Sequence, residues 1–276
     1  MDELDFTAAS RPAKTEPYNP AIAKMCFEAL GKEEAISQGG TFFNEAQVND
    51  KMYLLVEGEV ALVRGKKVLY IIKGGEIFGE MAAISRLPRS ATATARTNCR
   101  ALTLDPKQFQ SSIQKTPEFA LMLMNIIINR LRLTSAIVRK DLSDGGKTPE
   151  TRVFDAKLLA ELVEHLPHPP AHTHVNKVVM KEGEGGVFMY VVVEGVIAIS
   201  VKDHVVGRIA EGGVFGEMAL IDQSPRTATA TAETDCELLA INRNVFLNMV
   251  KTNPGFAVAL LKGLADRLRL MTSHHK

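Results

Sequence analysis

The chain repeats itself at a step of 137 residues, and this repeat constrains the fold more than any other feature. The string Phe-Gly-Glu-Met-Ala at residues 78–82 returns at 215–219, and the Pro-Arg pair at 88–89 returns at 225–226. Compared without gaps, residues 53–132 and 190–269 share 32 identities in 80 positions. Solenoid units are about 20–50 residues long, so this longer period predicts two whole domains of one fold.

The repeat and the composition together predict the domain organisation. We expect an N-terminal extension over residues 1–19, a first domain over 20–142, a linker over 143–150 and a second domain over 151–276. The linker contains Ser-Asp-Gly-Gly-Lys-Thr-Pro, a composition typical of loops. The chain has 33 Lys and Arg against 32 Asp and Glu, for a net charge of +1. This balance is unlike the basic body that nonspecific nucleic-acid or membrane binding favours, so neither partner is expected.

Cysteine usage and the absence of a targeting pattern predict a cytoplasmic protein. The acidic N-terminus is followed by no apolar segment, and the longest apolar stretch, residues 119–128, is too short to span a membrane. The three cysteines, Cys26, Cys99 and Cys236, include no close pair. An odd number of separated cysteines is typical of neither a disulfide framework nor a zinc site.

Each copy shows short β-rich runs followed by a helical pattern. Runs at 52–56, 191–193 and 196–201 end in turn signals, and residues 90–95 alternate with the period of a strand, as do 227–232. Many short strands separated by turns favour an antiparallel jelly-roll barrel. The predicted fold class is mainly β with α: two tandem β jelly-roll barrels, each flanked by helices.

A long closing helix is expected after each barrel. Pro117 and Pro254 stand where proline is tolerated, in the first turn of a helix. An apolar stripe follows in the first copy at a spacing near 3.6 residues or its multiples, formed by Met122, Ile126, Leu133 and Ile137. A short helix from about residue 151 to 165 is expected to open the second domain.

The repeated string has the residue types needed to bind a sugar phosphate. Gly79 has no Cβ, so a ligand can approach the backbone closely. A helical turn after it would direct N–H groups at an anion, and Arg89, nine residues beyond Glu80, can donate two parallel hydrogen bonds to a phosphate. Glu80 can accept a hydrogen bond from a sugar hydroxyl. This spacing indicates a ligand with both a ribose and a phosphate.

These two strings resemble the phosphate-binding cassette of the cyclic-nucleotide-binding domain family. The resemblance covers roughly residues 20–140 and 150–273, with barrels similar to catabolite activator proteins and a tandem layout similar to regulatory subunits of cyclic-AMP-dependent protein kinase. It implies that the cassette backbone and arginine bind the cyclic phosphate and the glutamate binds the ribose 2′-hydroxyl. The implied ligand-binding residues of the first site are Gly79, Glu80, Met81, Ala82, Arg89, Ser90, Thr134 and Ser135. Those of the second site are Gly216, Glu217, Met218, Ala219, Arg226, Thr227, Met271 and Thr272.

The resemblance also bears on the base. In the family, a Thr-Ser pair late in the closing helix meets adenine, and Thr134 and Ser135 match it, which favours cyclic AMP at the first site. The corresponding pair of the second copy comes one residue late, at Thr272. Thr227, directly after the cassette arginine, is common in cyclic-GMP sites, so the preference of the second site stays open.

Several other patterns are set aside. Four histidines at 165, 168, 172 and 174 crowd one segment, but no acidic or cysteine ligand lies in the run, so no metal is expected. The Gly-Gly-Lys-Thr string at 145–148 is interpreted as linker because a proline follows it. The turn that has Gly183-Glu184 in the second copy has Ala46-Gln47 in the first, which we expect to alter loop shape more than ligand binding. No catalytic constellation is visible, so we expect no enzyme.

The sequence therefore predicts a cyclic-nucleotide receptor that binds cyclic AMP, or cyclic GMP, in one or both domains. Closure of the C-terminal helices would signal to a separate, unidentified effector protein, and the closing helices could also form a homodimer. One alternative is a regulatory subunit that inhibits a partner enzyme until nucleotide binds. Another is a cyclic-dinucleotide sensor, although retention of Glu80 and Glu217 favours a cyclic mononucleotide.

Overall fold

The computed structural model describes residues 19–138 and 152–273, and leaves the side chains of Lys67, 133–138 and 272–273 undescribed. The elements of the first copy are α1 (Pro20–Leu30), β1 (Lys32–Ile36), β2 (Thr41–Phe43), β3 (Met52–Glu57), β4 (Glu59–Arg64), β5 (Lys67–Lys73), β6 (Ile77–Phe78), α2 (Glu80–Ser85), β7 (Thr92–Ala95), β8 (Cys99–Leu104), α3 (Pro106–Lys115) and α4 (Pro117–Val138).

The second copy repeats this order element by element. Its members are α5 (Ala156–His165), β9 (Ala171–Thr173), β10 (Val178–Met180), β11 (Phe188–Glu194), β12 (Ile197–Val201), β13 (His204–Ile209), β14 (Val214–Phe215), α6 (Glu217–Asp222), β15 (Thr229–Ala232), β16 (Cys236–Asn242), α7 (Arg243–Thr252) and α8 (Pro254–Ser273). The cassette helices α2 and α6, the strands β7 and β15, and the helices α3 and α7 are offset by 137 residues at both ends. The predicted duplication is confirmed at the level of structure.

Each copy forms a barrel from two four-stranded antiparallel sheets. In the first copy the strand orders are β1-β8-β3-β6 and β2-β7-β4-β5, and the second copy has the equivalent orders β9-β16-β11-β14 and β10-β15-β12-β13. Alternate residues of β7 are buried, with Ala93 and Ala95 fully inside. The predicted fold class, two tandem jelly-roll barrels with flanking helices, is confirmed.

The helices begin where their sequences favour it. Asp105 caps α3 in a capping box with Gln108, and α4 and α8 begin at Pro117 and Pro254, as expected. The helix that opens the second copy begins at Ala156 rather than near residue 151, because the side chain of Asp155 accepts a hydrogen bond from the backbone N–H of Leu158 and caps it there.

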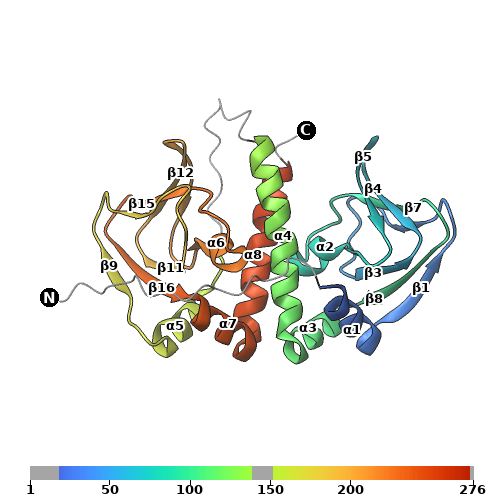
Figure 1. Ribbon diagram of the computed structural model, residues 1–276, viewed down its shortest axis with the longest axis horizontal. Helices are drawn as coiled ribbons and strands as arrows, with labels where there is room; N and C mark the ends of the chain where they lie inside the picture. The colour runs from blue at the N-terminus through green and yellow to red at the C-terminus, as the bar shows by residue number, and fades with distance from the viewer. Residues whose placement is uncertain (1–18, 139–151, 274–276) are drawn as a thin grey trace.

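The two closing helices run side by side between the barrels (Figure 1, α4 in green and α8 in red). Phe119, Leu123, Ile127 and Leu131 are buried along α4, in one hydrophobic core with Leu260 and Leu268 of α8. Of the predicted stripe, Met122 is buried and Ile126 partly buried, while the side chains at 133 and 137 lie outside the described residues. The apolar surface of α4 thus packs within the chain, and a homodimer through these helices stays a prediction.

Of two further predictions, on the linker and on a loop, the structure tests only the second. The predicted linker, residues 143–150, lies outside them, so the proposed domain boundaries stay predictions. Ala46 adopts a left-handed φ of 62°, close to the 84° of Gly183, and the backbone N–H of each donates to the carbonyl of its cassette arginine at 2.9 Å. The expected change in loop shape therefore does not occur.

Candidate functional site

The cassette of each copy lies between its barrel and the closing helices. Gly79 ends β6 in the left-handed region at φ 72°, and α2 follows it with no side chain capping its first turn. Gly216 holds the same conformation at φ 77° before α6. A Cβ on Gly79 would lie 2.7 Å from Nη1 of Arg89, and one on Gly216 would lie 2.5 Å from Nη1 of Arg226. Glycine is required here for two reasons, the positive φ and the approach of the arginine.

The first cassette arginine is buried and, among the described residues, forms no ion pair with a carboxylate. Arg89 is 3% exposed, and it donates from Nη1 to the Gly79 carbonyl at 2.7 Å and from Nη2 to the Lys51 carbonyl at 2.6 Å. Nη2 also donates to Oδ1 of Asn49 at 3.2 Å, and the guanidinium lies 3.9 Å from the ring centre of Phe43. Its Nε is buried and has no hydrogen-bond partner among the described residues.

The second cassette arginine has the same arrangement. Arg226 is 6% exposed, and it donates to the carbonyl of Gly216 at 2.7 Å and to that of Phe188 at 2.6 Å. Burial holds the pKa of both guanidinium groups below the ordinary arginine value. Among the described residues neither arginine forms an ion pair, so each site contains a buried positive charge solvated by neutral oxygens. Such a charge is costly to bury, and an anion would neutralise it.

The cassette glutamates are paired, and the sequence analysis missed the partners. Glu80 is 2% exposed and Oε1 accepts from Nη1 of Arg130 on α4, while Glu217 is 1% exposed and Oε1 accepts from Nη1 of Arg267 on α8. A carboxylate has two oxygens, so the second can accept from a ribose hydroxyl. The signal for these partners was present, because Arg-Leu-Arg at 130–132 recurs at 267–269, but only the structure connects it to the cassette.

The second arginine of each triplet reaches into the other copy. Nη2 of Arg132 donates to Oδ1 of Asp222 at 2.9 Å, and its Nε donates to the other oxygen of the same carboxylate. Nη1 of Arg132 also donates to the Pro225 carbonyl at 3.3 Å, and Arg269 donates to the equivalent carbonyl of Pro88. Each closing helix thus contacts its own cassette glutamate and the loop before the other copy's cassette arginine.

The structure brings most of the predicted site residues together. In each copy the cassette glycine, glutamate and arginine are in direct contact or adjacent, Ala82 and Ala219 are buried, and Met81 and Met218 pack on the helical core. Ser90 and Thr227 lie directly after the arginines, and Met271 is partly buried on α8. The side chains of Thr134, Ser135 and Thr272 lie outside the described residues, so the predicted base contacts stay predictions.

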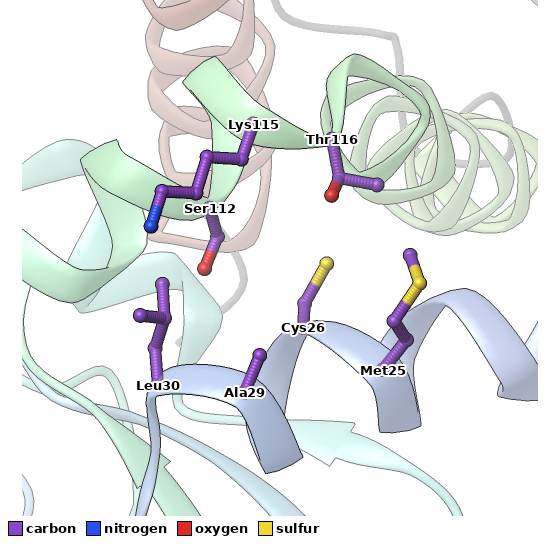
Figure 2. A pocket seen from close by; sticks show the side chains of 7 residues that line it. All are labelled: Met25, Cys26, Ala29, Leu30, Ser112, Lys115 and Thr116. Carbon is purple, nitrogen blue, oxygen red and sulfur yellow. The ribbon is translucent and has the colours of Figure 1, made fainter.

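A separate pocket between α1 and α3 is lined by Met25, Cys26, Ala29, Leu30, Ser112, Lys115 and Thr116 (Figure 2). Cys26 is 4% exposed, and burial raises the pKa of its thiol. Because the thiolate is the reactive form, a raised pKa makes this thiol less nucleophilic. Cys99 and Cys236 are also free and buried.

Comparison with known proteins identifies the family. The pattern of the cyclic nucleotide-binding domain matches residues 33–116 and 172–253, more than half of the chain. The protein belongs to the cyclic nucleotide-binding domain family and carries two tandem copies of that domain.

Its relatives are regulatory proteins and kinases. The chain is 23% identical to a cAMP-dependent protein kinase regulatory subunit of Eremothecium gossypii, over 79% of this chain and 44% of that protein. It is 25% identical to the Yarrowia lipolytica regulatory subunit, over 79% and 54%, and 26% identical to cGMP-dependent protein kinase 2 of Mus musculus, over 79% and 27%. The chain spans about half the length of the two regulatory subunits.

Solved structures of the same family are also similar. A cAMP-bound PfPKA-R matches at 24% identity and a TM-score of 0.33, over 84% of this chain and 77% of that chain. Thermus thermophilus catabolite activator protein matches at 25% identity and a TM-score of 0.41, over 57% and 72%. No helix in the described ranges is both long and apolar enough to cross a membrane.

Proposed function

We propose that this chain is a receptor for a cyclic mononucleotide and binds one molecule in each cassette. The observation that carries the proposal is the buried arginine at each site, Arg89 and Arg226, which is held against a cassette glycine and forms no ion pair within the described part of the chain. Nε of Arg89, which has no hydrogen-bond partner in the described ranges, is a further donor for a phosphate oxygen. Backbone N–H groups of residues 79–82 and 216–219, with Ser90 and Thr227, would bind the remaining phosphate oxygens.

Cyclic AMP is the proposed ligand of the first site. This preference is supported by the family resemblance of Thr134 and Ser135 and by the match to cAMP-dependent regulatory subunits. Cyclic GMP is the alternative at the second site, where Thr227 follows the arginine and cGMP-dependent kinases are among the relatives. Glu80 and Glu217 would each accept a hydrogen bond from a ribose 2′-hydroxyl, in addition to the bond that each already accepts from an arginine of its closing helix.

The proposed signal is a change in the closing helices. A ribose hydroxyl at Glu80 would alter its pairing with Arg130, and two residues along α4 Arg132 binds Asp222 at the end of α6. The first site is therefore connected through α4 to the second cassette. If nucleotide binds more tightly when α4 occupies one position than another, binding at the first site would change the nucleotide affinity of the second. A cytoplasmic location is proposed because the three cysteines are free thiols.

A regulatory subunit that restrains a partner enzyme is the second candidate. It is favoured by the similarity to kinase regulatory subunits, of which the chain spans about half. In either role the effector is a separate protein and the chain has no catalytic activity of its own. A catalytic role would be revealed by turnover of nucleotide during the binding experiments.

Titration calorimetry with cyclic AMP, cyclic GMP and a cyclic dinucleotide tests the proposal. We expect heat and a thermal upshift with a cyclic mononucleotide, lost from one site in Arg89→Ala and from the other in Arg226→Ala. No heat and no shift with either mononucleotide would overturn the receptor assignment. Tighter binding of the cyclic dinucleotide would instead favour the alternative sensor.

A further inference from the structure

Two of the four clustered histidines lie beside an acidic side chain, Asp235, that is distant from them in the sequence. His172 and His174 lie at alternate positions on β9 and its end, so both point to the same side of the strand. β9 pairs with β16 in the register Cys236 to Thr173 and Glu237 to His172, which sets Asp235 opposite His174. Side-chain nitrogens of the two histidines and a carboxylate oxygen of Asp235 all lie within 4.8 Å of one another.

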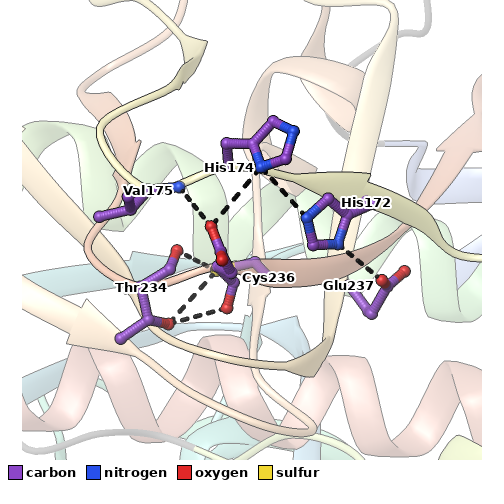
Figure 3. Close-up of polar contacts among 7 residues, drawn as sticks. His172, His174, Val175, Thr234, Cys236 and Glu237 are labelled. Atoms are coloured by element: carbon purple, nitrogen blue, oxygen red, sulfur yellow. Dashed lines mark hydrogen bonds and ion pairs between the residues drawn. The ribbon is translucent and has the colours of Figure 1, made fainter.

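The separation of the two imidazole nitrogens matches that of ligands on a tetrahedral metal ion, and the carboxylate oxygen lies somewhat farther away. Nε2 of His172 and Nδ1 of His174 are 3.3 Å apart, and Nδ1 of His174 is 3.8 Å from Oδ1 of Asp235. An ion with bonds of about 2.0–2.1 Å to tetrahedral ligands separates them by about 3.3–3.4 Å. Figure 3 shows the two imidazoles meeting nearly at a right angle, with one nitrogen of each ring directed at the other.

Glu237 fixes the tautomer that a metal ligand needs. Its Oε1 lies 2.9 Å from Nδ1 of His172, on the side of the ring away from His174 (Figure 3). An ionised carboxylate can only accept, so Nδ1 of His172 carries the proton and Nε2 presents its lone pair toward His174. A carboxylate behind a histidine is a common support for a metal ligand. The neighbouring Cys236 points inward and is 1% exposed, so it is not a ligand.

The first domain provides a comparison within the same molecule. At the 137-residue step the four positions are Ala35, Ser37, Asn98 and Arg100. Asn98 accepts from the backbone N–H of Gln38 at 3.0 Å, and Asp235 accepts from that of Val175 at 2.8 Å. The turn therefore needs only an acceptor oxygen, which an amide supplies. The carboxylate and both imidazoles are additional to what this fold requires.

We propose that His172, His174 and Asp235 form a binding site for a divalent transition metal of the zinc class, supported by Glu237. Two imidazole nitrogens and one carboxylate oxygen are ligands that zinc accepts, and three protein ligands leave a position for water. The ion would fasten the three-residue strand β9 to β16 at the edge of the second barrel. The first barrel lacks these ligands, so the chain would bind one ion at this site.

Titration of the full chain with ZnCl₂ tests this site, in a His274→Ala, His275→Ala background that removes the terminal histidine pair. We expect one zinc ion per chain, an affinity at least about tenfold weaker in Asp235→Asn, and a loss of about 10–100-fold in Glu237→Gln. Asp235→Asn keeps the oxygen that the turn uses, as Asn98 does, so folding should not change. His168→Ala is the matched control and should bind as the parent does.

Three results would overturn the proposal. The first is no zinc binding by the parent, and the second is unchanged zinc binding by a folded His174→Ala variant. The third is binding of Ca²⁺ as tight as that of zinc, because Ca²⁺ binds oxygen ligands rather than imidazole. Unfolding temperatures of the metal-free variants, measured in chelator, distinguish a lost ligand from a lost fold.

Discussion

The two cassette arginines make the same contacts with backbone carbonyls but have different side chains at the positions around them. Toward the cassette, Nη1 of each donates to the glycine carbonyl at 2.7 Å. Toward the barrel, Arg89 contacts the amide of Asn49 and the ring of Phe43, whereas the equivalent positions of the second copy are Gly186 and Met180. A Cβ on Gly186 would collide with the guanidinium of Arg226.

This difference shows which part of the site has been preserved in both copies since the duplication. Contacts between the arginine and the cassette backbone are common to both copies, so they are what the proposed phosphate site requires. The residues at the positions beside the first guanidinium have diverged, from Asn49 and Phe43 to Gly186 and Met180. The two sites should therefore bind the same phosphate group and respond differently to substitutions behind the arginine.

Replacement of the arginines should have the largest effect, and an equal one in both sites. Lysine keeps the charge but cannot make the forked contact, and disruption of a buried charge pair costs on the order of 3–5 kcal/mol, roughly two to four decades of affinity. Calorimetry on Arg89→Lys and Arg226→Lys would measure this. A loss confined to one variant would show that only one cassette binds nucleotide.

Gly186→Ala should weaken only the second site. The added methyl group would displace Arg226, and overpacking of this kind costs about 1–3 kcal/mol, or roughly 5- to 150-fold in affinity. Gly185→Ala is the matched control, because a Cβ there meets nothing within 4 Å. Equal effects of the two alanines, measured by nucleotide titration, would contradict the packing described for Arg226.

The ion pair between Arg132 of α4 and Asp222 of the second copy should be measurable as a coupling energy. A double-mutant cycle with Arg132→Gln and Asp222→Asn should give about 0.5–3 kcal/mol in the free energy of unfolding, since the two side chains are in direct contact and mostly buried. The position equivalent to Asp222 is Ser85, so the first copy offers no such carboxylate. A coupling energy of zero would contradict a role for this ion pair in the proposed coupling of the two sites.

The smallest effect concerns the shared turn. Ala46 holds a left-handed φ where the second copy has Gly183, a conformation that costs a non-glycine residue about 1–2 kcal/mol. Ala46→Gly should stabilise the first domain by less than about 1 kcal/mol, because glycine also loses more entropy on folding. Gly183→Ala should destabilise the second domain. Denaturant unfolding of both variants would detect opposite signs, and equal signs would contradict the strain at Ala46.

Much of the fold follows from the sequence because the repeat is long and its cassette is distinctive. The barrels, the closing helices after Pro117 and Pro254 and the cassette position were all predictable from local pattern. Strands as short as β6 and β14, each of two residues, give no periodic signal. Their pairing depends on partners elsewhere in the barrel.

The parts of the site that sequence could not supply are contacts between distant segments. Arg130 and Arg132 are two residues apart on a helix, yet one reaches its own cassette and the other the opposite copy. Asp235 joins the histidines of β9 only through strand pairing across more than 60 residues. Spacing along the chain does not contain this information, because the packing of complete domains determines it.

Equilibrium dialysis with radiolabelled cyclic AMP tests the central claim most directly, because it counts bound nucleotides. Two molecules per chain are expected for the unaltered protein, one each for Arg89→Ala and Arg226→Ala, and none for the double variant. Cyclic GMP dialysed in parallel would reveal a different preference at the second site. Binding that survives in the folded double variant would contradict the claim that the two buried arginines define the sites.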